Sequence, residues 1–322
     1  MSHVHVIHEN DAWVEPLRAA FERRGTPYRE WFLDEGALDL RGEPPEGVFY
    51  NRMSASSHTR DHRFAAEYTG HVLEWLHRHG RPVINGRRAL ALEVSKVAQY
   101  QALAQFDIAV PDTIAAIGRR HIEAAAAKLG FPVIVKHNRA GKGLGVKLIL
   151  SEAALKEYLA EDEAVGPVDG TWLVQRYIAA PEPFITRVEF VGGKFLYAVR
   201  VDTSAGFELC PADQCQVDFA GAACPAVAPS DRFRIVEGFR HPLVKRYERF
   251  LAANDIGIAG IEFIVDREGN AFTYDVNTNT NYNPDAEAKA GVSGMQAIAD
   301  FLTARLNQLD AVPVWLGDVA GV

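Results

Sequence analysis

Residues 260–277 read GIEFIVDREGNAFTYDVN, two apolar stretches around a short polar one. The apolar stretches are Gly260–Val265 and Phe272–Val276, and Asp266–Asn270 between them is rich in turn-forming residues. Apolar runs of this length that are separated by such a turn are typical of a β-hairpin. We therefore predict a β-hairpin over these residues.

Three side chains with oxygen ligands lie within the predicted hairpin. Asp275 and Asn277 are two residues apart, so their side chains face the same side of one strand. Pairing around the turn allows Glu262 to lie across from them on that side. Two carboxylates and an amide oxygen are hard ligands, and they suit magnesium bound to a nucleotide. The same alternation also fits a polar, solvent-facing sheet surface, so the hairpin alone does not decide between the two.

Composition and charge limit the class of protein. The chain has 322 residues, of which 48% are hydrophobic and 24% charged, as in a globular protein of two or three packed subdomains. Its formal net charge of −8 argues against a general nucleic-acid binder. Three cysteines, Cys210, Cys215 and Cys224, are too few for a disulfide framework, and their role does not follow from the sequence.

The N-terminus carries acidic residues, Glu9 and Asp11, where a signal peptide would need a long apolar core. No apolar run approaches the roughly 20 residues that a membrane helix requires. We therefore expect a soluble cytoplasmic protein with reduced cysteines, no membrane partner and no nucleic-acid partner.

The pattern of strands and helices divides the chain into three parts. Residues 1–87 alternate short apolar strands with amphipathic helices, which predicts a small open α/β domain. No Gly-x-Gly-x-x-Gly follows the first strand, Val4–Ile7, so a dinucleotide site is not expected there. Residues 88–180 contain a glycine-rich hairpin. Residues 181–322 contain a hairpin around Gly192–Gly193 and then the last hairpin.

Several segments upstream of the last hairpin have settings that suit a bound nucleotide. Lys136 ends an apolar strand, and Lys96 opens a helix, where its charge opposes the helix dipole. The segment Gln175–Ile178 ends a strand and offers backbone donors and acceptors to a purine edge. The loop after Lys136 has three glycines that let backbone N–H groups approach phosphates: Gly141, Gly143 and Gly145. Each feature is common by itself, and a lysine at a strand end is usually only solvated.

Taken in order, these pieces resemble the ATP-grasp superfamily, and most of all its RimK-like branch of amino-acid ligases of the glutamate type. The resemblance runs from about Val48 to the last helix, Gly294–Leu309, and rests on the order and spacing of its elements. These elements are SKVAQYQAL with Lys96, FPVIVK with Lys136 and its glycine loop, LVQRYI with Gln175, Arg187, Arg200, AGIEF with Glu262, DVN with Asp275 and Asn277, and Asn51–Ser56.

The resemblance implies an α/β fold in which a nucleotide is held between two α+β lobes, preceded by the small α/β domain. Glu262, Asp275 and Asn277 would bind two Mg²⁺ ions, for which Mn²⁺ can substitute. Arg187 and Arg200 would act as catalytic residues by stabilising the transferring phosphoryl group. ATP would contact two lysines, the loop glycines and the segment between the lobes: Lys96, Lys136, Gly141, Gly143, Gly145, Gln175, Arg176, Tyr177 and Ile178.

The sequence departs from the family pattern at two places. The family commonly has Asp where Glu262 stands and Glu where Asp275 stands. That exchange keeps both carboxylates but affects which oxygen bridges the metals. The branch also has an acid just before the position of Arg187, near the ribose, where this chain has Ile185–Thr186. Glu182 is a candidate replacement for ribose recognition.

The activity that the resemblance implies is that of an acid–amino-acid ligase, which joins a carboxylate to an amine through an acyl-phosphate. The sequence does not identify either substrate. The group Arg52, Ser54, Ser56 and Ser57 either binds an amino-acid carboxylate or only caps a helix. Two other functions stay open. One is an ATP-grasp ligase for a non-amino-acid carboxylate in natural-product or cofactor biosynthesis, and the other is a non-catalytic ATP-binding scaffold. The branch is often oligomeric, which allows a homo-oligomer.

Overall fold

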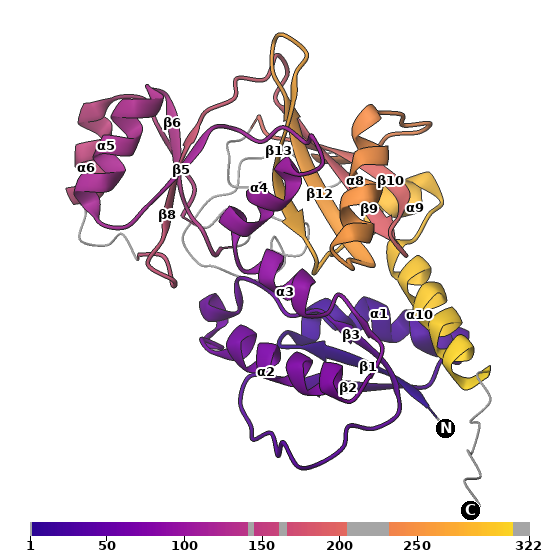
Figure 1. The fold of residues 1–322 in the computed structure, drawn as a ribbon. Helices are drawn as coiled ribbons and strands as arrows, with labels where there is room; N and C mark the ends of the chain where they lie inside the picture. The colour runs from indigo at the N-terminus through magenta and orange to yellow at the C-terminus, as the bar shows by residue number, and fades with distance from the viewer. Residues whose placement is uncertain (1, 141–144, 161–165, 205–231, 312–322) are drawn as a thin grey trace, which may run out of the picture.

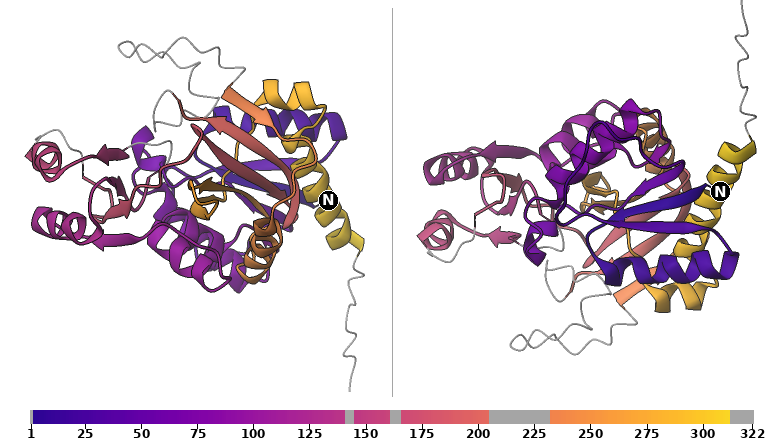
Figure 2. Two further views of the ribbon diagram at one scale, coloured as in Figure 1. Left: turned by 90° about the horizontal axis from the view of Figure 1, so that it is seen from above. Right: turned by 90° about the horizontal axis from the view of Figure 1, so that it is seen from below.

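The computed structural model describes residues 2–140, 145–160, 166–204 and 232–311, and these form three β-sheets with helices around them (Figure 1). The predicted loop glycines Gly141 and Gly143, and all three cysteines, lie outside the described residues. Seen from above and below, the N-terminal sheet and the largest sheet lie against each other, and the third sheet lies to one side (Figure 2).

The N-terminal sheet is parallel, with strand order β2-β1-β3-β4. Its strands are β1 (His3–His8), β2 (Tyr28–Phe32), β3 (Gly47–Asn51) and β4 (Val83–Ile84). Two helices pack on it, α1 (Asp11–Arg24) and α2 (Ala65–Arg78), with the 3-10 turn η1 (Ser57–Arg60) between β3 and α2. β3 is buried along its whole length, as expected for a strand that is covered on both faces. The predicted open α/β arrangement is confirmed.

The smaller antiparallel sheet has strand order β5-β8-β6-β7. Its strands are β5 (Thr113–Ala116), β6 (Val133–His137), β7 (Lys147–Ile149) and β8 (Trp172–Arg176). Two helices, α5 (Arg119–Leu129) and α6 (Glu152–Ala160), share a hydrophobic core with this sheet. β6 pairs with β7 as the predicted hairpin, and Gly145 after its loop has a φ of +71° that only glycine adopts readily.

The largest sheet is antiparallel, with strand order β11-β10-β9-β12-β13. Its strands are β9 (Phe184–Val191), β10 (Lys194–Asp202), β11 (Phe233–Ile235), β12 (Ile258–Val265) and β13 (Ala271–Asn277). The remaining helices are α3 (Arg87–Glu93), α4 (Lys96–Ala104), α8 (Pro242–Ala253), α9 (Pro284–Ala290) and α10 (Gly294–Ala311).

The two faces of the largest sheet pack against different parts of the chain. Val188 and Phe190 of β9 share a core with α3, α4 and α8. Tyr197 and Val199 of β10 instead share a core with β1, β3, α1 and α10, so the N-terminal sheet is joined to the largest sheet by a continuous apolar interior. None of the helices in the described ranges is long and apolar enough to cross a bilayer.

Helix α4 covers the outer edge of β13. The Gln99 side chain accepts a hydrogen bond from the backbone N–H of Val276 (3.1 Å) and donates one to its carbonyl oxygen (2.8 Å). The Tyr100 hydroxyl donates to the carbonyl oxygen of Tyr274 (2.9 Å). Because an uncovered edge strand leaves its backbone groups unpaired, these contacts both protect β13 and fix α4 beside it.

Candidate active site

The hairpin predicted over Gly260–Val265 and Phe272–Val276 is confirmed as β12 and β13, with Glu262 directly opposite Asp275 and Gly260 opposite Asn277. Directly opposite residues of an antiparallel pair project from the same face, so the two carboxylates lie together. The register then shifts, and Phe263 pairs with Thr273. The extra residue, Tyr274, forms a β-bulge, a feature that re-aims neighbouring side chains.

Arg187 of β9 lies on the other side of Glu262, because these residues are also directly opposite each other. Its guanidinium donates to Glu262 Oε1 (3.0 Å), to Thr280 Oγ1 (2.7 Å) and to the Glu189 carboxylate. Burial opposes the positive charge, but the carboxylates outweigh it and hold the pKa of Arg187 above its usual range. Arg187 is therefore a permanently charged group in a fixed orientation.

Gly260 provides the space for this guanidinium. A Cβ atom at Gly260 would lie 2.7 Å from Cζ and 2.8 Å from Nε of Arg187. Both distances are well below an ordinary contact of about 3.5–4.0 Å between carbon atoms. The glycine in the GIEF segment is thus required for the guanidinium to lie against β12.

Lys96 brings a second positive charge to the hairpin. It is the first residue of α4, whose N-cap Ser95 accepts a hydrogen bond from the backbone N–H of Ala98. Lys96 Nζ lies 2.5 Å from Asp275 Oδ1. Burial opposes the lysine charge, but the Asp275 carboxylate outweighs it and raises the pKa of Lys96. The carboxylate also offsets the unfavourable position of a cation at the start of a helix.

Lys136, at the end of β6, is a third cation and has only neutral partners. Its Nζ donates to the Tyr100 hydroxyl (2.7 Å) and to Gln175 Oε1 (3.0 Å). Across the described ranges, Lys136 makes no ion pair with a carboxylate. Burial, with a further contribution from the charge on Lys96, lowers its pKa to about 7. A bound anion such as a phosphate would supply the missing negative charge.

The hairpin side chains suit a divalent cation. The pKa of Glu262 is raised, mainly by burial. The positive charge of Arg187 lowers this pKa, and the negative charge of Asp275 raises it. The amide nitrogen of Asn277 is buried and, among the described residues, finds no hydrogen-bond partner. Two converging carboxylates and the amide oxygen of Asn277 are oxygen ligands of the kind that Mg²⁺ accepts, whereas the amide nitrogen is not a metal ligand. The residues therefore fit the predicted metal site.

The predicted purine-binding segment lies at the end of β8. Gln175 is buried and directed at Lys136, whereas Arg176 points outward, 5.6 Å from the Phe272 ring centre and 3.4 Å from Asp112 Oδ2. The backbone N–H of Tyr177 donates to the carbonyl oxygen of Pro132 (3.3 Å), and Ile178 is buried. The segment thus connects the smaller sheet to β9, next to Lys136.

Arg200 and Arg187 lie on opposite faces of the largest sheet. The Gly192–Gly193 turn starts β10 in a register that would place both arginines on one face, but a bulge between Phe195 and Tyr197 shifts it by one residue. Arg200 then lies opposite Thr186 instead, on the other face of the sheet, because a one-residue shift reverses the side-chain direction. Its guanidinium carbon lies 3.7 Å from the Phe184 ring centre. The expected joint role of the two arginines does not fit this register.

Arg52, which was expected to bind a substrate carboxylate together with three serines, makes contacts within the protein. Arg52 is buried and donates to Asn281 Oδ1 (2.8 Å), to the Thr280 carbonyl oxygen (3.1 Å) and to Asn279 Oδ1 (3.2 Å). It therefore ties the end of β3 to the segment after β13. The Ser54 and Ser56 hydroxyls contact each other (2.9 Å), and the Ser57 hydroxyl is buried and unpartnered within the described part of the chain. The expected role of these four residues in binding a substrate carboxylate stays a prediction.

Two residues that the sequence did not point to, partly buried Glu93 and buried Asn85, fix the end of β13. The Glu93 carboxylate accepts hydrogen bonds from the backbone N–H of Thr278 (2.7 Å) and of Ala55 (3.3 Å), and burial raises its pKa. Asn85 Nδ2 donates to the carbonyl oxygens of Ile258 (2.7 Å) and Thr278 (2.8 Å). Because Thr278 follows Asn277, both residues position the hairpin. A lone Glu and a lone Asn carry no sequence signal of this kind.

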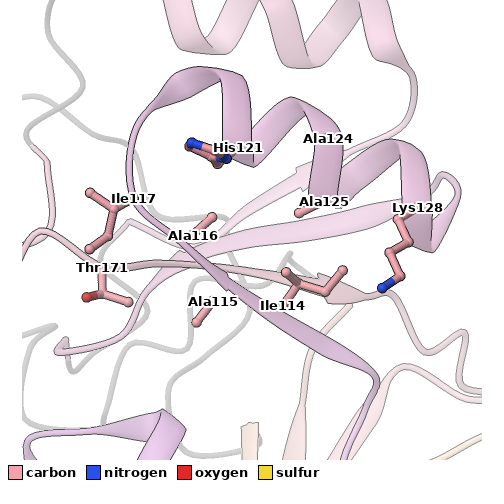
Figure 3. A pocket seen from close by; sticks show the side chains of 9 residues that line it. All are labelled: Ile114, Ala115, Ala116, Ile117, His121, Ala124, Ala125, Lys128 and Thr171. Atoms are coloured by element: carbon pink, nitrogen blue, oxygen red, sulfur yellow. The ribbon is translucent and has the colours of Figure 1, made fainter.

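A surface cavity of about 650 Å³ lies elsewhere, between β5 and α5 (Figure 3). Alanines form much of its wall, and Lys128 and His121 of α5 are its basic lining residues. None of the predicted site residues lines it, so we do not include it in the active site.

Solved structures share this fold. The chain is similar to a RimK domain ATP-grasp protein from Sphaerobacter thermophilus, with 20% identity and a TM-score of 0.66 over 93% of this chain and 99% of that one. It is also similar to the ATP-grasp ligase PsnB complexed with minimal precursor, with 16% identity and a TM-score of 0.65 over 95% and 100%. The fold is the ATP-grasp fold, and the chain is an ATP-dependent carbon–nitrogen ligase of that class. Residues 97–302, well over half of the chain, match the family model described as D-ala D-ala ligase C-terminus, so the chain belongs to this family.

Two curated relatives are also similar in sequence. The chain is 23% identical to N-acetylaspartylglutamate synthase A of Mus musculus over 86% of this chain and 71% of the relative. It is 24% identical to β-citrylglutamate synthase B of Danio rerio over 73% of this chain and 54% of the relative. ATP-grasp ligases bind ATP with magnesium, and another structure of PsnB contains Mg and ADP.

Proposed function

We propose that this ligase activates a substrate carboxylate with ATP and joins it to the amino group of an amino acid or a peptide. The observation that carries the proposal is one partly buried cluster in which Glu262 and Asp275 converge with Lys96, Lys136 and Arg187. Carboxylates for a metal ion and several cations for phosphate oxygens are what transfer of a phosphoryl group requires.

The reaction proceeds in two steps. A carboxylate oxygen of the substrate attacks the γ-phosphorus of ATP, the bond to the β,γ-bridging oxygen breaks, and ADP leaves. The amine nitrogen then attacks the carbonyl carbon of the acyl-phosphate, inorganic phosphate leaves, and the nitrogen loses a proton. In the first step negative charge shifts onto the leaving ADP, and stabilising this charge lowers the barrier. In the second step the amine and the acyl-phosphate have to be held in contact. Charge stabilisation and positioning are therefore the main contributions of the protein.

Within this proposal Glu262, Asp275 and Asn277 hold Mg²⁺, in two sites, with Mn²⁺ as an alternative. The metal, when bound, supplies positive charge that binds and polarises the phosphate oxygens. The roles of the surrounding side chains follow from their contacts. Lys96 is paired with Asp275 and would contact the phosphate oxygens of the nucleotide.

Lys136 and Arg187 act on the transferring group. Lys136 approaches the phosphates from β6, supported by neutral hydrogen-bond partners that do not compete for its charge. Arg187, oriented by Glu189 and Thr280, stabilises the charge on the transferring phosphoryl group. Arg200 has no part in this step, because it lies on the other face of the sheet.

The adenine is proposed to lie against Gln175–Ile178, and the phosphates beneath the loop of Gly141, Gly143 and Gly145. We also propose that the chain divides into parts 1–87, 88–180 and 181–322, with the nucleotide between the second and third parts. Glu182 is proposed to contact the ribose.

The names of the relatives support the substrate class. Two of them are synthases of glutamate conjugates, and PsnB has been solved with precursor peptide. The name β-citrylglutamate also indicates that the activated acid need not be an amino acid, which favours a second candidate: a ligase for a non-amino-acid carboxylate. Both candidates share the same site and differ only in the acid.

A screen that pairs acids with amines and follows ADP release separates the two candidates. Glutamate, N-acetylaspartate and citrate are tested as acids, and glutamate and short peptides as amines. ADP release that needs both partners, and that Glu262→Gln abolishes, is the expected result. ADP release from the wild type that does not depend on any acid would contradict the ligase proposal.

A further inference from the structure

A cavity of about 750 Å³ lies at the β11 edge of the largest sheet, and part of its lining, including Thr186 and Arg200, faces away from the Glu262–Arg187 cluster. Its lining includes residues of β9, β10, β11, β12 and α9. A volume between roughly 300 and 1,000 Å³ is usual for a site that binds a small molecule. Neither the nucleotide site nor the proposed substrates account for this cavity.

Two arginines of the lining are directly opposite each other. Arg200 of β10 pairs with Arg234 of β11, and like charges in this position are destabilising. In the described ranges, neither guanidinium has a carboxylate partner or a hydrogen-bond acceptor. Glu237 is the acidic residue of the lining, and it pairs with neither arginine among the residues that the structure describes. The charges on Arg200 and Arg234 are therefore not balanced by an acidic residue of the described ranges.

Aromatic rings form part of the wall. The Arg200 guanidinium lies over Phe184, with 3.7 Å from its carbon to the ring centre, and the guanidinium N–H groups stay available at the edges of the plane. His241 lies beside Phe263, with 4.9 Å between ring centres. The backbone N–H of Leu243 donates to His241 Nδ1 (3.2 Å), so the neutral ring carries its proton on Nε2 and can donate it.

Thr186 extends the row of polar groups across the sheet. It lies opposite Arg200 on one side and opposite Phe263 on the other, so a cation, a hydroxyl and an aromatic ring follow one another on a single face. Guanidinium groups match carboxylate and phosphate oxygens in geometry, and the rings suit an apolar or aromatic body.

We propose that this cavity binds an organic anion, a carboxylate or phosphate group on an aromatic or aliphatic body, at a site separate from the reaction centre. Its separation from the nucleotide site rests on the strand register, which directs Arg200 and Arg187 to opposite faces. The site does not depend on the identity of the substrates of the ligase.

The test is binding of small probes to the whole chain with saturating ADP and Mg²⁺, so that the nucleotide site is filled. The probes are 3-phenylpropionate and phenyl phosphate, which distinguish the two anionic groups, and 3-phenylpropanol, which has the body without the charge. We expect one equivalent of at least one anionic probe to bind by calorimetry. We also expect roughly tenfold weaker binding in Arg200→Met and in Arg234→Met, since each removes a charge-assisted hydrogen bond.

The matched control is Arg249→Met, which removes an exposed arginine of α8 that does not line the cavity. It should leave probe binding unchanged. Because Arg200→Met relieves repulsion with Arg234, its melting temperature should not fall, and circular dichroism checks that it is folded. Equal binding of the alcohol, no binding of either anion, or unchanged affinity in Arg200→Met would overturn the proposal.

A separate outcome distinguishes this proposal from the ligase function. If Arg200→Met is folded but loses ADP binding, Arg200 belongs to the nucleotide site, and the anion site is wrong while the ligase function stands. If Glu262→Gln loses ADP release and keeps probe binding, the two sites are independent, as proposed.

Discussion

Replacing Gly260 by alanine is expected to disable the site without unfolding the protein. The new Cβ atom would lie 2.7 Å from Arg187 Cζ, so the guanidinium has to withdraw by roughly 1 Å to reach an ordinary contact. The end of an arginine is normally free to move. Here Glu262, Thr280 and Glu189 hold it, so the displacement breaks hydrogen bonds to charged groups.

The size of the effect follows from that displacement. A misplacement of about 1 Å in a catalytic group can lower the rate about 100-fold. Overpacking of this kind costs about 1–3 kcal/mol of stability. We therefore expect kcat for ADP release to fall about 100-fold in Gly260→Ala, while the protein stays folded at 25 °C and nucleotide affinity changes little.

The assay is steady-state ADP release with the best acid and amine pair, together with thermal unfolding. Gly70→Ala is the matched control, because a Cβ at this helical glycine would meet only Leu90 Cδ2, at 3.9 Å. In an Arg187→Ala background, Gly260→Ala should cause little further loss, since the clashing group is gone. Wild-type kcat in Gly260→Ala, or a full additional loss in the double variant, would refute the reasoning.

Three further predictions concern the supporting residues. Lys136 has a folded-state pKa of about 7, below the value near 10.4 of an unfolded lysine, so the unfolded state binds more protons between these pH values. Stability of the nucleotide-free protein should therefore rise from pH 7 towards pH 10, and Lys136→Met should remove this rise in urea titrations. Asn85→Ala leaves the N–H groups of Gly257 and Ile258 unpaired and should cost about 3 kcal/mol or more in urea titrations; a loss below about 0.5 kcal/mol would contradict this. Tyr100→Phe removes a hydroxyl that accepts from Lys136 Nζ, and should raise KM for ATP more than it lowers kcat; an unchanged KM would count against Lys136 as a phosphate ligand.

The last hairpin could be predicted because its signal is local. The five-residue polar turn pairs Val265 with Ala271, and this part of the hairpin follows from the alternation and the turn length. Continued unchanged, that register would put Glu262 opposite Tyr274. The bulge at Tyr274, which the sequence does not mark, brings Asp275 opposite Glu262. The remaining strands and helices that were predicted also had clear apolar periodicity. The resemblance to the ATP-grasp superfamily also predicted the correct class of fold.

Other parts depend on contacts that the sequence does not display. A bulge of one residue in β10 reversed the side on which Arg200 lies, and nothing in the segment Phe195–Tyr197 marks it. β5 and α3 are four and seven residues long, too short for a clear period. Glu93 and Asn85 both bind backbone groups of Thr278, 185 and 193 residues away in the chain, which only the folded structure brings together.

The measurement that tests the central claim most directly is magnesium-dependent ADP binding by calorimetry. It compares the wild type with Asn277→Ala and Lys136→Ala over a range of Mg²⁺ concentrations. If Glu262, Asp275 and Asn277 hold the metal, Mg²⁺ tightens ADP binding in the wild type and does so much less in Asn277→Ala. Lys136→Ala should weaken ADP binding at every Mg²⁺ concentration. Unaltered affinity and magnesium dependence in both variants would contradict the location of the active site.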